Sequence, residues 1–370
     1  IGSTGKMFAP VAVMQLVDQG LIDLDLPVVR FLPTFSMQSP QYRQITVRML
    51  IDLSAGFPGS AYANAFTTVP YDGYARGVMA NLARSSLKTT PGAMSVYCND
   101  CFTVAGEVVA AVSGMPFTTY VDQEILTPLG MTRSQYITGA LPPAGTVARV
   151  VREGKDLPLE ITNVYASGGL MSTPTDMAAF ARMLMAGGTA GSTRILTPAS
   201  VDEMGTSQLR TTLDPVTESQ WIYGLGWDSV RDLSLDAVGV RAWVKGGDTG
   251  DYLAGLVVAP EAGLAAFVSG SGTYSSSAAQ AVAEEVILNA LVERGDIPAM
   301  PAKVSTDQPA KAPPTEAQIQ SILGTYIGTP SVYRRIVRGT GDTLVFESLI
   351  EGRWVPGTAT HSNREDGARR

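Results

Sequence analysis

The feature that most constrains the fold is a set of short β-type segments in the second half of the chain. Apolar runs at 222–227, 242–245, 252–258 and 264–269 are separated by turn residues. Short runs at such even spacing are typical of an antiparallel meander. The segment 276–294 follows with helical amphipathic spacing, so we expect a long helix directly after the sheet.

The chain before this meander is predicted to be mainly helical. Residues 3–20 carry apolar side chains on one helical face, and Gly20 fits a C-cap. Thr173 fits an N-cap, because Pro174 follows at the first helical position. The remaining predicted helices are 72–84, 99–112, 117–125, 174–185 and 198–204.

The C-terminal part is predicted to form a separate small domain. Residues 298–318 are rich in proline and carry little that can pack, which indicates a linker between a domain at 1–297 and one at 319–370. Three short strands are expected in the last domain, at 333–337, 343–347 and 353–355, followed by a polar tail.

Composition excludes several classes of protein. The 370 residues are 45% hydrophobic, which suffices for a sizeable core, and the net charge is −7. No basic cluster is long enough to follow a phosphate backbone, so we expect no nucleic-acid partner. The densest apolar stretch, 104–112, contains Glu107 and is shorter than the ~18–20 residues of a membrane span, so no transmembrane segment is predicted.

The start of the sequence gives no information on localisation. The chain begins at Ile1, without an initiator methionine or a signal peptide. Because Ile1 lies two residues before the serine discussed below, we expect that upstream residues are missing from this sequence.

The two cysteines and the single histidine limit the possible chemistry. Cys98 and Cys101 form one C-x-x-C, whereas a zinc site needs four ligands, and His361 lies far away in the polar tail. We therefore interpret the cysteines as small apolar residues one helical turn apart. With one histidine and no G-x-S-x-G, a Ser-His-Asp hydrolase is disfavoured, so a serine enzyme would need another base.

A serine and a lysine near the N-terminus form a possible nucleophile and base. Ser3 and Lys6 are three residues apart and therefore share one face of a helix. A neutral lysine in a desolvated site can remove the proton of a serine hydroxyl. A serine and a lysine at this spacing also occur together by chance, and such a pair usually lies at a solvent-exposed helix start without a catalytic role.

Two further patches follow in order. Tyr97 and Asn99 stand at a predicted helix start after a Pro-Gly turn, and Lys245-Gly246-Gly247 ends a β run before a glycine-rich turn. A tyrosine at such a place is usually packing, and Lys-Gly-Gly is usually a hairpin turn. The order and the local context of the three patches are more specific than each patch alone.

With these patches the sequence resembles the serine β-lactamase and penicillin-binding-protein-like hydrolases, in particular the branch of class C-type β-lactamases, D-amino-acid peptidases and related esterases. The handful of segments that carry the resemblance span most of residues 1–275: IGSTGKMFAPVAVMQLVDQGLIDLDLPVVRFLP, ITVRMLIDLSAGFPG, TTPGAMSVYCNDCFTVAGEVVAAVSG, LTPLGM, ASGGLMSTPTDMAAFARMLM and VKGGDTGDYLAGLVVAPEAGLAAFVSG. The resemblance implies an α+β fold (an α/β sandwich), with an antiparallel sheet flanked by helices, beside an all-helical lobe. It also implies a periplasmic or secreted location and no cofactor.

The resemblance also implies catalytic roles. Ser3 resembles the acylated nucleophile, Lys6 its base and Tyr97 a second base. Lys245 would place a positive charge near Tyr97, which would favour the phenolate and depress the pKa of Tyr97.

The remaining implied residues would bind the substrate. Asn99 resembles the residue that bonds a substrate amide. The oxyanion hole would be the backbone N–H groups of Ser3 and of Asp248, the residue after Gly246 and Gly247.

Two departures from the family pattern bear on the substrate. Gly246 stands where β-lactamases carry the threonine of Lys-Thr-Gly, so the hydroxyl that binds a penicillin carboxylate is missing. The carboxylate of Asp248 would repel an anionic substrate if it pointed inward, and we expect it to point outward. The sequence thus predicts a serine hydrolase acting on a small ester, amide or D-amino-acid peptide rather than on a β-lactam.

Two other interpretations concern function and the C-terminal region. A non-catalytic relative that binds peptidoglycan peptides or a protein partner remains the alternative to an enzyme. The C-terminal β domain resembles the lipocalin-like appendage of some family members, on the basis of Tyr326-Ile327-Gly328.

Overall fold

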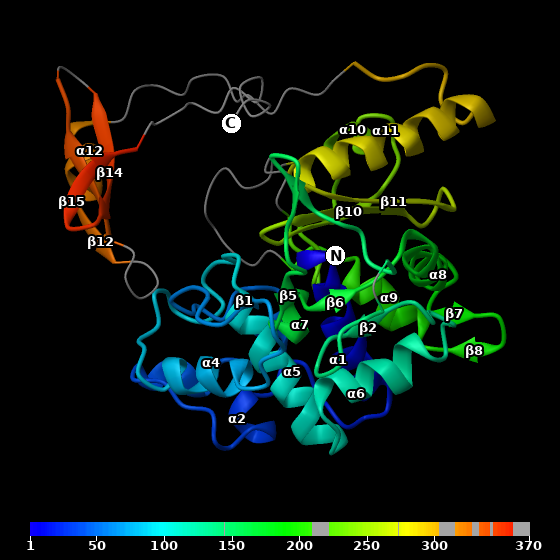
Figure 1. Ribbon diagram of the computed structural model, residues 1–370, viewed down its shortest axis with the longest axis horizontal. Coiled ribbons are helices and arrows are strands. Elements are labelled where there is room, and N and C mark those ends of the chain that lie inside the picture. The colour runs from blue at the N-terminus through cyan, green and yellow to red at the C-terminus, as the bar shows by residue number, and fades with distance from the viewer. Residues whose placement is uncertain are drawn as a thin grey trace. The chain divides into compact units, whose positions relative to one another are not determined.

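The computed structural model describes residues 1–143, 145–208, 222–272, 274–302, 315–327, 333–340 and 343–357 (Figure 1). The chain divides into two compact units, Ile1–Val304 and Ser305–Arg370. The domain boundaries expected from the sequence stay predictions. His361, the polar tail from 358 onward and much of the predicted linker lie outside the described residues.

The predicted meander is present as a three-stranded antiparallel sheet in the order β11-β10-β9. Its strands are β9 (Trp243–Asp248), β10 (Tyr252–Ala259) and β11 (Leu264–Ser271). The expectation of a fourth strand at 222–227 is wrong, because the backbone there bends at Gly226, whose φ is +88°. The Gly226 N–H donates to the carbonyl of Ile51 instead of to a neighbouring strand.

Strand alternation gives the sheet two different faces. Trp243, Leu256 and Val258 belong to the large core cluster, whereas Val244 and Val257 belong to a second cluster. Successive side chains of a strand point to opposite faces, so each cluster lies on one face of the sheet. The helix predicted at 276–294 is present as α11 (Ser276–Arg294). The second cluster packs under α11, which covers that face of the sheet in Figure 1.

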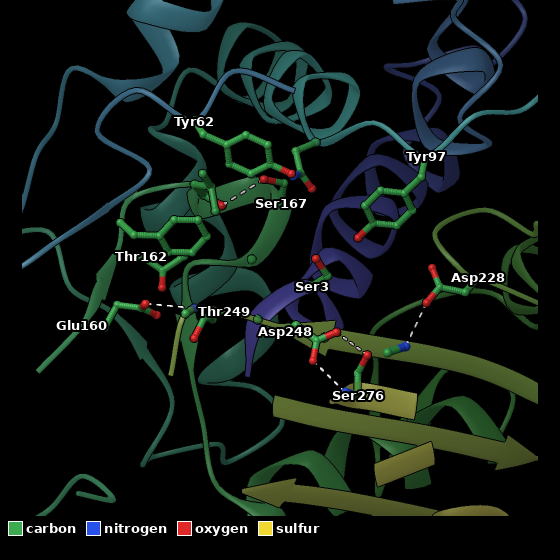
Figure 2. Close-up of a pocket in the computed structure, with 18 of the residues that line it drawn as sticks. Ser3, Tyr62, Tyr97, Glu160, Thr162, Ser167, Asp228, Asp248, Thr249 and Ser276 are labelled. Carbon is green, nitrogen blue, oxygen red and sulfur yellow. Dashed lines mark hydrogen bonds between the residues drawn. The ribbon is translucent and has the colours of Figure 1, made fainter. Parts of the chain in front are cut away.

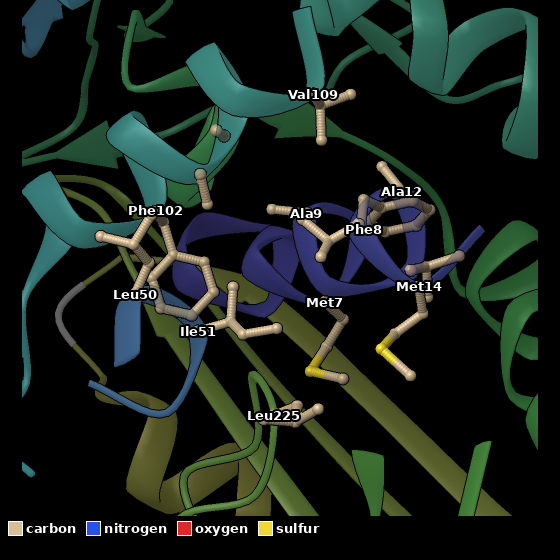
Figure 3. Packing of buried hydrophobic residues seen from close by; sticks show 14 of the residues in the cluster. Met7, Phe8, Ala9, Ala12, Met14, Leu50, Ile51, Phe102, Val109 and Leu225 are labelled. Carbon is tan, nitrogen blue, oxygen red and sulfur yellow. The ribbon is translucent and has the colours of Figure 1, made fainter. Parts of the chain in front are cut away.

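The other face packs against the N-terminal helix and the helical lobe. Residues 2–18 form a 3-10 helix, η1 (Gly2–Met7), followed by α1 (Phe8–Asp18), rather than one continuous α-helix. Pro10 has no N–H to bond to the carbonyl of Lys6, which favours a tighter first turn. Met7 and Phe8 are fully buried at the centre of the large core, beside Leu225 (Figure 3).

Most of the predicted helices are present. The side-chain oxygen of Thr173 accepts a hydrogen bond from the Asp176 N–H at 3.3 Å, which confirms the predicted N-cap of α8 (Pro174–Met185). The other helical elements in the described part of this unit are α2 (Val28–Phe31), η2 (Pro40–Gln44), α3 (Val47–Ile51), α4 (Tyr74–Leu82), α5 (Asn99–Ser113), α6 (Phe117–Val121), the π-helical turn η3 (Asp122–Leu126), α7 (Tyr165–Gly168), α9 (Pro198–Met204) and α10 (Leu233–Asp236).

Several two-residue strands join the loops of this unit in antiparallel pairs. They are β1 (Phe66–Thr67) with β5 (Ile161–Thr162), β2 (Gln135–Tyr136) with β6 (Leu170–Met171), β3 (Val151–Arg152) with β4 (Lys155–Asp156), and β7 (Thr189–Ala190) with β8 (Thr193–Arg194). Sheet, flanking helices and helical lobe together form the expected α+β fold.

The C-terminal unit contains a short helix and an antiparallel sheet. The sheet has the strand order β12-β13-β14-β15. Its elements are α12 (Glu316–Ile322), β12 (Gly324–Ile327), β13 (Tyr333–Arg338), β14 (Leu344–Ile350) and β15 (Arg353–Pro356). The three strands predicted in this region are therefore present, and the likeness to a lipocalin stays a prediction.

Candidate active site

A cavity of about 580 Å³ brings the three sequence patches together (Figure 2). Six of the predicted site residues line it: Ser3, Tyr97, Asn99, Gly246, Gly247 and Asp248. The side chains of Lys6 and Lys245 are buried behind this lining, with relative exposures of 0% and 1%. Segments nearly 250 residues apart in the sequence therefore meet around one serine hydroxyl.

Lys6 contacts Ser3 and two carbonyl oxygens. Its Nζ lies 2.9 Å from the Ser3 Oγ, 2.6 Å from the Asn99 Oδ1 and 2.6 Å from the main-chain oxygen of Ser167. The 3-10 turn of η1 places Lys6 one turn after Ser3, so both side chains leave the helix on the same side. Ser167, which lies in α7, is a partner that the sequence patches did not predict.

The surroundings of Lys6 disfavour its charged form. Burial lowers the pKa of Lys6 well below its usual 10.5, and the nearby charge of Lys245 lowers it further. The carboxylate of Asp228 opposes this shift. A neutral lysine amine has two N–H groups and one lone pair. The two N–H groups match the carbonyl oxygens of Asn99 and Ser167, and the lone pair matches the hydroxyl of Ser3.

The Tyr97 side chain points toward Ser3 (Figure 2), and both buried lysines lie close to its ring. The Nζ atoms of Lys6 and Lys245 lie 4.8 Å and 5.5 Å from the centre of its ring. One face of the ring is open to the cavity, so 36% of the residue is exposed. Lys245 thus lies near Tyr97, as the sequence predicted.

The expected depression of the Tyr97 pKa is wrong. Desolvation of the hydroxyl among the surrounding protein raises the pKa of Tyr97 well above 10.0, and the carboxylate of Asp228 raises it further. Hydrogen bonding with Ser3 opposes the shift. Tyr97 is therefore a neutral phenol in the resting site, chiefly because its hydroxyl is desolvated.

Asp228 is a further site residue that the sequence prediction missed. The Lys245 Nζ donates to its two carboxylate oxygens at 2.8 and 2.9 Å and to the carbonyl of Gly246 at 2.8 Å. These contacts use all three protons of the ammonium group. A buried lysine that keeps its charge needs a carboxylate partner, so the strand pattern around Lys245 was a signal to search for one.

The alternation of β9 determines what each glycine of the third patch contacts. Gly247 shares the face of Lys245, and a Cβ there would lie 2.3 Å from the Ile1 oxygen and 2.4 Å from the Thr4 nitrogen. Gly246 faces α11, where a Cβ would meet the side chain of Gln280 at 2.3 Å. The missing side chains therefore let η1 and α11 approach β9 closely.

The side chain of Asp248 points toward α11 and away from Ser3. Its carboxylate accepts hydrogen bonds from the backbone N–H of Ser276, at 2.6 Å, and from the Ser276 hydroxyl (Figure 2). The expectation of an outward orientation is therefore confirmed.

The strand pairing of β9 determines where the backbone N–H of Asp248 points. In an antiparallel ladder the N–H groups of alternate residues point to the same side. The N–H groups of Val244 and Gly246 donate to Ser229 and Asp228, away from β10. The Asp248 N–H therefore also points away from β10. A Cβ on Gly2 would lie 2.8 Å from the Asp248 nitrogen, so this edge of β9 touches the turn that carries Ser3.

Tyr62 and Cys98 form hydrogen bonds that hold the start of α5, where Asn99 lies. The Asn99 Nδ2 donates to the Tyr62 hydroxyl at 3.2 Å, a contact that the sequence did not predict. Cys98 is the N-cap of α5, where its Sγ accepts from the Cys101 N–H at 3.1 Å. Both cysteines are free thiols and buried, in agreement with their interpretation as packing residues.

Among the described residues, no group of three or more His, Cys, Asp or Glu side chains is placed to hold a metal ion. In the same part of the chain, no single helix is both long and apolar enough to cross a membrane. Helix α5 and the segment Phe117–Leu126 reach that length and composition only as a pair, which bends by 76°.

Comparison with known proteins decides the family. A family profile described as Beta-lactamase matches residues 1–290. The chain belongs to this family. Its members are serine hydrolases, and the expected family and fold are thereby confirmed.

The similar proteins include penicillin-binding proteins and amide hydrolases. Penicillin-binding protein 4 of Amycolatopsis lactamdurans is 27% identical over 289 residues, which cover 75% of this chain and 72% of that protein. The D-alanyl-D-alanine-carboxypeptidase/endopeptidase AmpH of Escherichia coli strain K12 is 27% identical, over 48% of this chain and 46% of that protein. The solved structure of a D-stereospecific amidohydrolase from a Streptomyces species is 25% identical, with a TM-score of 0.60, and covers 73% of this chain and 80% of its own.

Proposed function

We propose that this protein is a serine hydrolase that cleaves an amide or ester bond through an acyl-enzyme on Ser3. The observation that carries the proposal is the environment of Lys6, which is fully buried with its Nζ 2.9 Å from the Ser3 Oγ. Two carbonyl oxygens, of Asn99 and Ser167, accept the N–H groups of a neutral amine. The lone pair of Lys6 is then directed at the serine hydroxyl, as a general base requires.

In the acylation step the Ser3 Oγ attacks the carbonyl carbon of the substrate while its proton passes to the Lys6 Nζ. The carbonyl oxygen becomes an oxyanion, which accepts hydrogen bonds from the N–H groups of Ser3 and Asp248. Removing one donor of such a pair costs about 3–4 kcal/mol of transition-state stabilisation in other acyl-transfer enzymes.

Tyr97 then supplies the proton that the leaving group needs. Because the pKa of Tyr97 is raised, its hydroxyl is protonated in the resting site and donates to the departing nitrogen or oxygen. Lys6, now an ammonium, returns its proton to Tyr97. In deacylation a water molecule takes the place of the leaving group and attacks the acyl carbon. Tyr97 accepts the proton of this water while its own proton passes to Lys6, and Lys6 gives a proton to the Ser3 Oγ as the bond from Oγ to the acyl carbon breaks.

The state of Lys245 favours a substrate without a carboxylate beside the scissile bond. Its three protons are already bonded to Asp228 and Gly246, and its charge is neutralised by Asp228. Gly246 offers no hydroxyl in place of the missing threonine. We therefore favour an esterase or a D-amino-acid amidase or peptidase over a β-lactamase. Similarity to a D-stereospecific amidohydrolase supports this choice.

Labelling tests the nucleophile. A fluorescent phosphonate should label the wild-type protein on Ser3, and Ser3→Ala should abolish labelling without changing the circular dichroism spectrum. Lys6→Met should slow labelling strongly, because the base is lost while the length of the side chain is kept. A folded wild-type protein that stays unlabelled, yet binds peptidoglycan peptides, would favour the non-catalytic alternative.

Substrate comparison tests the bond that is cleaved. We expect turnover of a p-nitrophenyl ester and of a D-amino-acid p-nitroanilide. A chromogenic cephalosporin should be turned over little, because its carboxylate finds neither a threonine hydroxyl at Gly246 nor a free proton on Lys245. A cephalosporin hydrolysed faster than both other substrates would contradict the proposed preference.

A further inference from the structure

Two aromatic side chains line the cavity without being covered by protein. Tyr62 and Phe66 are 57% and 40% exposed, and both belong to the lining of the cavity that contains Ser3. Their rings stack with centroids 6.4 Å apart and an angle of 17° between the planes. We call Tyr62 and Phe66 the aromatic wall.

The loop that carries the aromatic wall is held in place. Phe66 lies in β1, opposite Thr162 of β5. Fully buried Asn163 donates from its Nδ2 to the Asn64 carbonyl and the Thr67 Oγ1, both at 2.9 Å, and its Oδ1 accepts from the Tyr71 N–H at 3.0 Å. The exposure of the two rings is therefore a property of an ordered loop, which makes a preformed apolar surface.

The aromatic wall lies on the acyl side of the cavity. Figure 2 shows Tyr97 on one side of Ser3 and Tyr62, with Thr162, on the other. In the proposed mechanism Tyr97 gives its proton to the leaving group, so the leaving group lies on the side of Tyr97. The side chain of the acyl group then points toward Tyr62 and Phe66.

We propose that the aromatic wall is a specificity subsite that binds an aromatic, uncharged side chain of the acyl group. Stacking and edge contacts between rings add to the gain from burying apolar surface. Among the described lining residues there is no Lys, Arg or His, whereas Glu160 lies on the same side as the wall. An acyl group that carries a carboxylate would therefore be repelled.

This inference rests on the proposed function for the direction of the acyl group, and the experiment separates the two. The ratio of kcat/KM for p-nitrophenyl phenylacetate to that for p-nitrophenyl acetate measures the subsite. We expect wild-type protein to prefer phenylacetate, and Tyr62→Ala or Phe66→Ala to lower this ratio about tenfold. Tyr62→Phe should keep the ratio because it keeps the ring.

Tyr71→Ala is the matched control. Tyr71 lies in the same loop and is 39% exposed, but it is not part of the cavity lining. Its backbone N–H, which holds the loop to Asn163, remains after the substitution. The control should keep the wild-type ratio, so a loss in the two wall variants cannot come from the loop alone.

A binding measurement makes the outcome independent of catalysis. In the Ser3→Ala background, phenylacetamide should bind more tightly than acetamide, and adding Tyr62→Ala or Phe66→Ala should remove the difference in an NMR titration. If neither variant changes the ester ratio or this binding, the aromatic wall is not a subsite. If the rings govern binding but no phosphonate labels Ser3, the wall stands and the proposed hydrolase function fails.

Discussion

The substitution Asp228→Asn tests whether one buried ion pair determines both stability and substrate choice. The Lys245 Nζ lies 2.8 Å from the Asp228 carboxylate, and the two side chains are 1% and 8% exposed. The carboxylate accepts two bonds from Lys245 and one from the Gly246 N–H at 2.9 Å. An asparagine offers one oxygen, and its NH₂ group would face donors.

The expected loss of stability follows from the unpaired charge that remains. Breaking a buried ion pair from one side costs about 3–5 kcal/mol of the free energy of unfolding. At roughly 2–4 °C per kcal/mol, the melting temperature should fall by on the order of 10 °C. The double variant Asp228→Asn/Lys245→Met removes the orphaned charge as well, so it should regain part of this loss in a thermal melt.

The same variant should change which substrates are cleaved. A proton of Lys245 becomes free and its charge is no longer neutralised, so a carboxylate-bearing cephalosporin should gain kcat/KM relative to a neutral ester. Asp228 also raises the pKa values of Lys6 and Tyr97, so both limbs of the pH profile should move to lower pH. An unchanged melting temperature together with an unchanged substrate ratio would refute this reasoning.

Three further outcomes are expected. For the wild type, kcat/KM should rise with pH as Lys6 loses its proton, at a pH well below 10.5. It should fall only above pH 10, where the Tyr97 hydroxyl loses its proton. A profile in which kcat/KM only rises, and still rises through pH 10, would exclude a neutral Lys6. Gly247→Ala should lower the free energy of unfolding by about 1–3 kcal/mol and reduce ester turnover, because its Cβ would lie 2.3 Å from a backbone oxygen. Gly77→Ala, whose Cβ would have no atom within 4 Å, should instead stabilise α4 by about 0.5–1 kcal/mol. Denaturant titrations measure both changes. Cys98 and Cys101 are both buried, so they should react with a thiol reagent slowly in the native protein and rapidly after unfolding. Fast labelling of the native protein would contradict their burial.

Local signals in the sequence were sufficient for much of the fold. The helix α8 was predicted with its cap because Thr173 and Pro174 act within one turn. The strands β9 to β11 were predicted because their alternation is local and their turns are marked by glycine. The segment 222–227 was wrongly predicted to be a strand because its apolar residues alternate. The positive φ of Gly226 accompanies a hydrogen bond from its N–H to the carbonyl of Ile51, and the local pattern does not contain this contact.

Residues of the candidate site could be predicted where they belong to a sequence motif. Residues that contact a motif residue only because of the fold could not be predicted. The three patches do meet at one cavity. Asp228 and Tyr62 were missed because neither belongs to a motif. The expected direction of the Tyr97 pKa was wrong mainly because the fold desolvates the Tyr97 hydroxyl, and the carboxylate of Asp228 raises the pKa further.

The 3-10 turn at the start of the chain limits where such a serine–lysine pair can be built. In a turn of about three residues, side chains three apart are eclipsed, whereas in an α-helix of about 3.6 residues per turn they diverge by about 60°. Ser3 and Lys6 lie in η1, before α1 begins. A designer who grafts the pair onto the middle of a regular α-helix would reproduce the spacing but not the alignment. The graft must include a tight turn, such as the one that precedes Pro10.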